Sequence, residues 1–140
     1  MTACTREGYG GYSDTLSIFH AETLQGVWTP HAQHPVLVDC ALARPAGRVV
    51  TRNGKLWRPI QDCRRGYGKG LVLAEIETLD RDTFVQTVRA EIAPGEHWGG
   101  SRLHTLNRCG SLEVIDGATT VRRQPLGALV PNLWQVPEPA

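Results

Sequence analysis

Residues 71–92 read LVLAEIETLDRDTFVQTVRAEI, and this stretch decides the fold class. In its second half, residues 84–92, every other position falls on one face, and that face is the more apolar one. The first half, residues 71–79, alternates in the same way, and Asp80, Arg81 and Asp82 between the halves supply a turn. This period of two predicts a pair of antiparallel strands, and therefore an all-β protein.

A second hairpin is predicted upstream, at Asn53-Gly54. A two-residue type I′ turn requires positive φ at both central positions, and Asn followed by Gly tolerates it. The turn fixes the register: Arg52 opposes Lys55, Thr51 opposes residue 56, and Val50 opposes Trp57. We therefore interpret Trp57 as a packing residue and not as a platform for a ligand.

A third hairpin is predicted where residues 103–107 and 112–115 flank the loop 108–111, and residues 15–20 form a shorter strand candidate. The segment RNGKL at 52–56 resembles RCGSL at 108–112, 56 residues later. About 50 residues is the length of a four-stranded propeller blade, so this spacing favours blades over an immunoglobulin-like sandwich, with chance similarity as the alternative.

Composition limits the function classes. The 140 residues are 41% hydrophobic, enough for one core. Fifteen basic and fourteen acidic residues almost cancel, so no long-range field favours nucleic acid or an anionic membrane. The longest apolar stretches are far shorter than a bilayer span, and the N-terminus lacks a signal-peptide pattern. We expect a cytoplasmic protein that binds neither nucleic acid nor membrane.

Neither a metal nor another cofactor is predicted. The four cysteines are widely and irregularly spaced, whereas zinc and redox sites need closely spaced sulfurs, so we expect idle thiols. His31 and His34 lie between Pro30 and Pro35, in chain expected to be extended, where residues three apart face opposite sides.

Polar residues gather where predicted strands meet loops, each near a proline or glycine: Asp39, Arg44, Gln61, Asp62, Tyr67, His104 and Asp116. Arg44 precedes a strand and suits a bidentate contact with a carboxylate or phosphate, or else clamps Asp39 or Asp62 internally. The loop 61–70 suits a sugar or phosphate site, with an ordinary solvated connection as the alternative. It does not match a Walker loop.

Aromatic and titratable side chains near these loops have two interpretations each. Tyr67 and Trp98 either stack on a sugar ring or hold their loops against the core. His104 is either a half-buried histidine with satisfied hydrogen bonds or a group for ligand binding or proton transfer. Asp116, followed by Gly117, indicates a turn first and a functional carboxylate second.

Several short motifs in order resemble a known family over roughly residues 15–120. These are Trp28-Thr29-Pro30-His31, His34-Pro35-Val36, Ala43-Arg44-Pro45-Ala46-Gly47, Gln61-Asp62, Tyr67-Gly68, His104-Thr105 and Ile115-Asp116-Gly117. Together they resemble the N-terminal domain of glucosamine inositolphosphorylceramide transferases and related bacterial proteins. That resemblance implies a fold similar to the five-bladed propeller glycosidases of the furanosidase and levansucrase type. Ala32 and His34 depart from the Pro and Asn expected in the family's His-Pro-x-Asn-Pro run.

The resemblance implies that Arg44, Gln61, Asp62, Tyr67 and His104 face a central polar funnel. At about 50 residues a blade, this chain holds about two of five blades. We therefore expect residues 15–124 to form a partial β-propeller, between a flexible segment at 1–14 and a proline-containing tail at 125–140. Unpaired strand edges recruit other chains, so self-association or a companion polypeptide is expected.

Three functions follow as hypotheses. The first is a carbohydrate-recognising segment that takes a glycan or nucleotide-sugar, with Asp39, Arg44, Gln61, Tyr67 and His104 as binding residues. The second is an active glycoside hydrolase or glycosyltransferase completed by further blades, with Asp62 as the catalytic acid or base. The third is a purely structural or interaction module.

Overall fold

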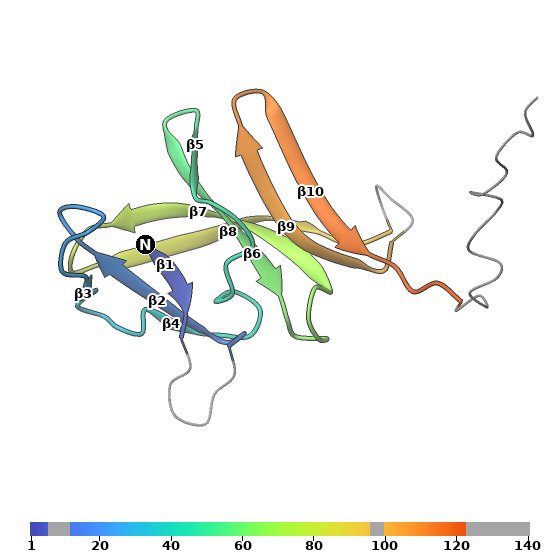
Figure 1. Cartoon of the computed structure of the whole chain (residues 1–140), viewed down its shortest axis with the longest axis horizontal. Helices are drawn as coiled ribbons and strands as arrows, with labels where there is room; N and C mark the ends of the chain where they lie inside the picture. Colours follow the sequence, from blue (N-terminus) through green and yellow to red (C-terminus); the bar gives the residue numbers. More distant parts are fainter. Residues whose placement is uncertain (6–11, 96–99, 123–140) are drawn as a thin grey trace, which may run out of the picture.

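The computed structural model describes residues 1–5, 12–95 and 100–122, and the part of the chain that it describes contains strands and turns but no α-helix. None of these residues therefore belongs to a helix that could span a membrane. The ten strands form three antiparallel sheets (Figure 1). Their bounds are β1 Thr2–Cys4, β2 Thr15–His20, β3 Thr29–Pro30, β4 Leu37–Val38, β5 Val50–Arg52, β6 Lys55–Asp62, β7 Gly70–Leu79, β8 Phe84–Ile92, β9 Arg102–Cys109 and β10 Leu112–Ala118.

The central sheet has the order β5-β6-β7-β8, a four-stranded antiparallel meander. Both hairpins predicted here are confirmed. Val50 pairs with Trp57 and Arg52 with Lys55, and the turn between them has positive φ at Asn53 (52°) and Gly54 (73°), as a type I′ turn requires. Strands β7 and β8 form the longest hairpin, which crosses the middle of the molecule in Figure 1.

Strand β8 differs from the simple alternation that its sequence predicts. Two irregularities shift its register against β7, between Leu73 and Ala74 and between Ile76 and Thr78. Each shift moves the following side chains relative to the sheet faces. As a result Val88, expected on the drier face, is exposed, whereas Ile92 at the end of the strand is half-buried and packs on the core.

The third hairpin is also confirmed, but its turn is shorter than predicted. Strand β9 continues through Cys109, which pairs with Leu112, so the loop is only Gly110-Ser111. Gly110 has a φ of 60°, and Ser111 is not among the positive-φ residues, as expected for a type II′ turn. The turn begins at the second residue of RNGKL but at the third residue of RCGSL. The two segments match in sequence but are therefore not structurally equivalent.

The small sheet of β1 to β4 is linked to the β7–β8 turn, where the Ala32 amide donates to the Arg81 carbonyl at 3.2 Å, and it contains two differences from the sequence prediction. Thr2–Cys4 lies in the segment expected to be flexible, yet pairs with β2 because this completes the backbone hydrogen bonds of that strand. The chain at His31 turns instead of staying extended, since the His34 amide donates to the His31 carbonyl at 2.9 Å.

The core has two parts, one on each face of the central sheet. Ile60, Val72 and Ala74 form one, with Leu42 packed against it. The other consists of Ala46, Leu71 and Leu103, with Ile92 and Leu106 at its margin. Alternate residues of β6 and β7 feed the two faces, as the period of two requires.

The segment 43–47 joins the central sheet to β9. The Ala46 amide donates to the Pro59 carbonyl at 3.0 Å, and the Leu106 amide donates to the Ala46 carbonyl at 2.8 Å. A Cβ atom on Gly47 would lie 2.1 Å from the Leu106 carbonyl oxygen, so only glycine allows β9 to approach this closely. This segment therefore sets where the β9–β10 hairpin lies.

Arg58 is fully buried on the face of β6 that carries Ile60. Its guanidinium donates to the carbonyls of Leu42 (2.6 Å) and Ala43 (3.3 Å) and, through Nε, to Oε1 of Gln86 (3.1 Å). Burial lowers the pKa of Arg58 to about 10, which leaves it charged at neutral pH. It therefore joins the loop before residue 43 to the sheet.

The described strands thus form an all-β arrangement of antiparallel sheets, in which the four-stranded sheets β1–β4 and β5–β8 are followed by the two-stranded β9–β10 sheet. They do not close into a propeller. Residues 125–140 and Trp98, to which the sequence analysis assigned a tail and a stacking role, lie outside the described residues.

Candidate functional site

Four of the six predicted site residues lie together. Arg44 and Gln61 are adjacent through the backbone, where the Gln61 amide donates to the Arg44 carbonyl at 2.9 Å. The Arg44 guanidinium lies over the Tyr67 ring, with Cζ 4.8 Å from the centroid. The Tyr67 hydroxyl forms a hydrogen bond with Nε2 of His104, and the two ring centroids are 5.0 Å apart. We call Arg44, Gln61, Tyr67 and His104 the polar cluster.

Each member comes from a different part of the chain. Gln61 is 1% exposed and donates through Nε2 to the His104 carbonyl at 2.9 Å, so it braces β9 against β6 and does not face solvent. Arg44 donates to the Tyr12 carbonyl at 2.9 Å, in the chain before β2. Tyr67, in the β6–β7 loop, is 47% exposed. The cluster therefore has one accessible aromatic ring on a braced polar base.

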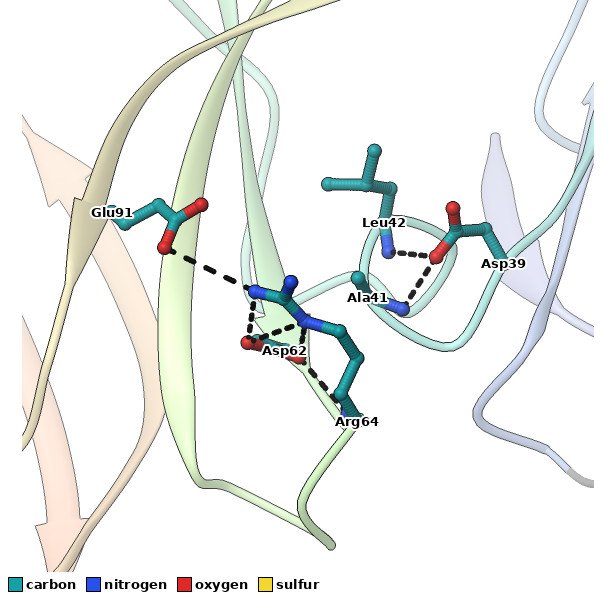
Figure 2. Close-up of polar contacts among 6 residues, drawn as sticks. All are labelled: Asp39, Ala41, Leu42, Asp62, Arg64 and Glu91. Carbon is teal, nitrogen blue, oxygen red and sulfur yellow. Dashed lines mark hydrogen bonds and ion pairs between the residues drawn. The ribbon is translucent and has the colours of Figure 1, made fainter.

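Asp62 lies away from this cluster because neighbours on a strand face opposite sides. Figure 2 shows Arg64 folded back onto it, with distances of 3.0 Å from Nε to Oδ1 and 2.8 Å from Nη2 to Oδ2. The same guanidinium lies 4.0 Å from Glu91. Hydrogen bonds from Arg64 hold the pKa of Asp62 below its usual range. An ionised carboxylate can accept a proton but cannot act as a general acid near neutral pH.

Asp39 has a local structural role. Its Oδ1 accepts hydrogen bonds from the backbone amides of Ala41 (2.6 Å) and Leu42 (3.2 Å), as Figure 2 shows. A side-chain oxygen that satisfies two successive amides stabilises a tight turn. Among the described contacts, both carboxylates therefore bond within their own loops, and Arg44 clamps neither Asp39 nor Asp62.

Asp116, on β10, contacts the polar cluster. Its Oδ1 accepts from the Thr105 amide at 2.5 Å and the Thr105 hydroxyl at 2.8 Å, and its Oδ2 lies 3.5 Å from Nδ1 of His104. The observed pairing of β9 with β10 places Asp116 opposite Thr105, whereas the predicted loop 108–111 would have placed it opposite Leu103, so the sequence did not indicate this contact.

A separate groove lies between the central sheet and the β9–β10 hairpin. Its volume is about 530 Å³, and Trp57, Leu73 and Leu106 are among the apolar residues that line it. Its cationic lining residues are Arg48, Arg52, Lys55, Arg89 and Arg108. Glu75 pairs with Lys55 (2.8 Å) and Arg89 (3.0 Å), which neutralises part of this charge. The groove was not predicted from the sequence because its walls come from six separate strands, β5 to β10. None of the residues of the polar cluster line this groove.

The described ranges contain no group of three or more His, Cys, Asp and Glu side chains arranged to hold a metal ion. The four cysteines are free thiols. The polar cluster offers hydrogen bonds, a cation and an aromatic ring, which are the groups that recognise a polar ligand with flat apolar faces, such as a sugar.

Fold and site together define an all-β domain of antiparallel hairpins with an exposed polar and aromatic cluster between its sheets. Residues 4–116 match the family described as "Glucosamine inositolphosphorylceramide transferase 1, N-terminal". The chain belongs to this family, the N-terminal domain of a transferase.

Similar proteins carry the same name. The glucosamine inositolphosphorylceramide transferase 1 of Oryza sativa subsp. japonica is 33% identical over 114 residues, which cover 73% of this chain and 15% of the relative. The Arabidopsis thaliana protein is 29% identical over 105 residues, or 69% of this chain and 14% of the relative. This chain thus spans about one seventh of their length. These relatives are plant proteins, not the bacterial ones that were expected. No solved structure matches the chain.

Proposed function

We propose that this chain is a carbohydrate-recognising domain associated with a glycosyltransferase, and that the polar cluster is its binding site. The observation that carries the proposal is the exposed Tyr67 ring, held between the Arg44 guanidinium and the His104 imidazole. An aromatic face covers the C–H groups of a sugar, while the neighbouring donors and acceptors bind its hydroxyls. Family membership supports the same conclusion, since the relatives are named glucosamine inositolphosphorylceramide transferases.

The fold belongs to the same proposal. The β5-β6-β7-β8 meander has the strand number and order of one propeller blade, and β9–β10 corresponds to the start of the next. We propose that these are blades of a propeller whose remaining blades come from further chain. Within the described residues β10 pairs only with β9, and Leu112, Val114 and Ile115 on it are exposed. Such an edge recruits another strand, so we expect self-association or a companion chain.

Catalysis is the second candidate function. The paired state of Asp62 favours a role as a base over the role of an acid. A folded preparation that releases no product from a broad panel of aryl glycosides would exclude hydrolysis by this chain. Location in the cytoplasm stays a prediction from the sequence.

Isothermal calorimetry with oligosaccharides and nucleotide-sugars tests the binding proposal. Tyr67→Ala should weaken binding about two- to tenfold, since stacking contacts contribute roughly 0.5–1.5 kcal/mol, whereas Tyr67→Phe keeps the ring and most of the affinity. Val27→Ala, at an exposed position outside the cluster, is the matched control. If Tyr67→Ala bound every ligand as tightly as the control, the polar cluster would not be the binding site.

A further inference from the structure

Three side chains in and beside the polar cluster form a chain of hydrogen-bonding groups. Tyr67 lies in the β6–β7 loop, His104 on β9 and Asp116 on β10. The Tyr67 hydroxyl meets Nε2 of His104, and Nδ1 of the same ring lies 3.5 Å from Oδ2 of Asp116. A hydroxyl, an imidazole and a carboxylate in this order form the arrangement that activates a nucleophile in hydrolases and transferases.

Asp116 is held in the state that this role requires. Partial burial acts to raise its pKa, but the hydrogen bonds from the Thr105 hydroxyl and amide, and the nearby His104, outweigh it and lower the pKa of Asp116. The carboxylate is therefore ionised, and Thr105 fixes its Oδ1. An ionised Oδ2 favours the tautomer of His104 with its proton on Nδ1, which leaves the lone pair of Nε2 to accept from Tyr67.

Two arginines contact Tyr67. The Arg44 guanidinium over the ring brings a positive charge within 4.8 Å of the centroid. Arg102 donates to the Tyr67 carbonyl. Next to it, Gly68 has a φ of 68°, and a Cβ there would lie 3.2 Å from the Leu103 carbonyl oxygen. The backbone that carries Tyr67 is thus fixed against β9.

We propose that Tyr67 is an activated nucleophile, with His104 as its base and Asp116 as the residue that positions His104. The inference rests on the proposed function, which supplies the substrate class: a glycoside whose anomeric carbon is the electrophile. Tyr67 Oη forms a bond to that carbon, and the bond to the leaving oxygen breaks with its electron pair. The phenol proton passes to Nε2 of His104 and from there to the leaving alcohol. Water then releases the sugar from Tyr67.

Labelling with benzenesulfonyl fluoride tests the nucleophile without any carbohydrate. Tyr67 Oη attacks sulfur, the S–F bond breaks, and fluoride leaves while His104 takes the proton. Tyr12 serves as the internal control, because at 61% exposure it is more accessible than Tyr67 at 47%. Mass spectrometry of the full chain after digestion should show Tyr67 labelled about tenfold faster or more, since a positioned base contributes at least that much.

Two variants separate the roles. His104→Gln should reduce the Tyr67 rate to that of Tyr12, and Asp116→Asn should reduce it partly while Tyr12 keeps its rate. In the unmodified chain the labelling rate of Tyr67 should rise between pH 5 and 8, where histidines lose their proton, whereas that of an ordinary phenol rises mainly towards pH 10. This pH profile decides the question even where a variant fails to fold.

Labelling of Tyr67 no faster than that of Tyr12, or a Tyr67 rate that His104→Gln leaves unchanged, would overturn the relay and leave carbohydrate binding untouched. Fast labelling of Tyr67 in a chain that binds no sugar would instead overturn the proposed function and keep an activated tyrosine.

Discussion

Gly47→Ala should destabilise the domain, because Gly47 lies where β9 approaches the segment 43–47 most closely. The new Cβ atom would lie 2.1 Å from the Leu106 carbonyl oxygen, whereas carbon and oxygen ordinarily approach to about 3.3 Å. Either β9 or the segment must move by roughly 1 Å. That movement disrupts the 2.8 Å hydrogen bond from the Leu106 amide to the Ala46 carbonyl.

The expected cost combines two contributions. Overpacking of a tight contact costs about 1–3 kcal/mol, and loss of one buried backbone hydrogen bond costs about 1 kcal/mol more. The free energy of unfolding should therefore fall by about 2–4 kcal/mol. In urea, with a typical slope of roughly 2 kcal/mol per M, the unfolding midpoint falls by about 1–2 M.

Urea unfolding followed by tryptophan fluorescence measures this change. Gly54→Ala is the control, since its Cβ meets no atom within 4 Å and it loses only the conformational preference at a φ of 73°. That loss is roughly 1 kcal/mol. If Gly47→Ala unfolded at the same urea concentration as Gly54→Ala, the close approach of β9 to Gly47 would be wrong.

Three further predictions follow from buried or paired groups. Arg58→Met keeps most of the side-chain volume but removes the buried hydrogen bonds from Arg58 to the carbonyls of Leu42 and Ala43, so the unfolding free energy should fall by about 2–4 kcal/mol in the same urea assay. Arg64 lowers the folded-state pKa of Asp62, so this pair contributes its full stabilisation above about pH 4 and loses it as pH falls through the lower pKa. The unfolding free energy of Asp62→Asn should therefore depend less on pH in this range. Burial raises the pKa of the Cys63 thiol, so iodoacetamide at pH 8 should alkylate Cys63 more slowly than the exposed Cys40; equal rates measured by mass spectrometry would contradict this.

The hairpins were predictable because their signals are local. Asn53-Gly54 fixed the pairing of β5 and β6, and the period of two in residues 71–92 predicted β7 and β8. The two register shifts between β7 and β8 have no local signal, since they arise where paired strands adjust to each other. The pairing of Thr2–Cys4 was missed for a similar reason, because it depends on β2, more than ten residues away.

The sequence predicted which residues belong to the candidate site better than it predicted how those residues are arranged. Tyr67 and His104 were chosen for their chemistry, and the structure brings them together with Arg44. Asp62 was grouped with them because it lies where a predicted strand meets a loop, but strand alternation sends its side chain and that of Gln61 in opposite directions. The partner of Asp62 lies only two residues away, and this i, i+2 pair with Arg64 was readable from the sequence.

The most direct test of the account is a nuclear magnetic resonance titration of the isotope-labelled chain with glycans and nucleotide-sugars. Specific binding at the polar cluster predicts that the resonances of Tyr67, His104 and Thr105 shift first and saturate together, while those of Trp57 and Leu73 in the groove stay in place. Shifts confined to the groove, or no saturable shift with any sugar, would contradict the claim that this cluster recognises carbohydrate.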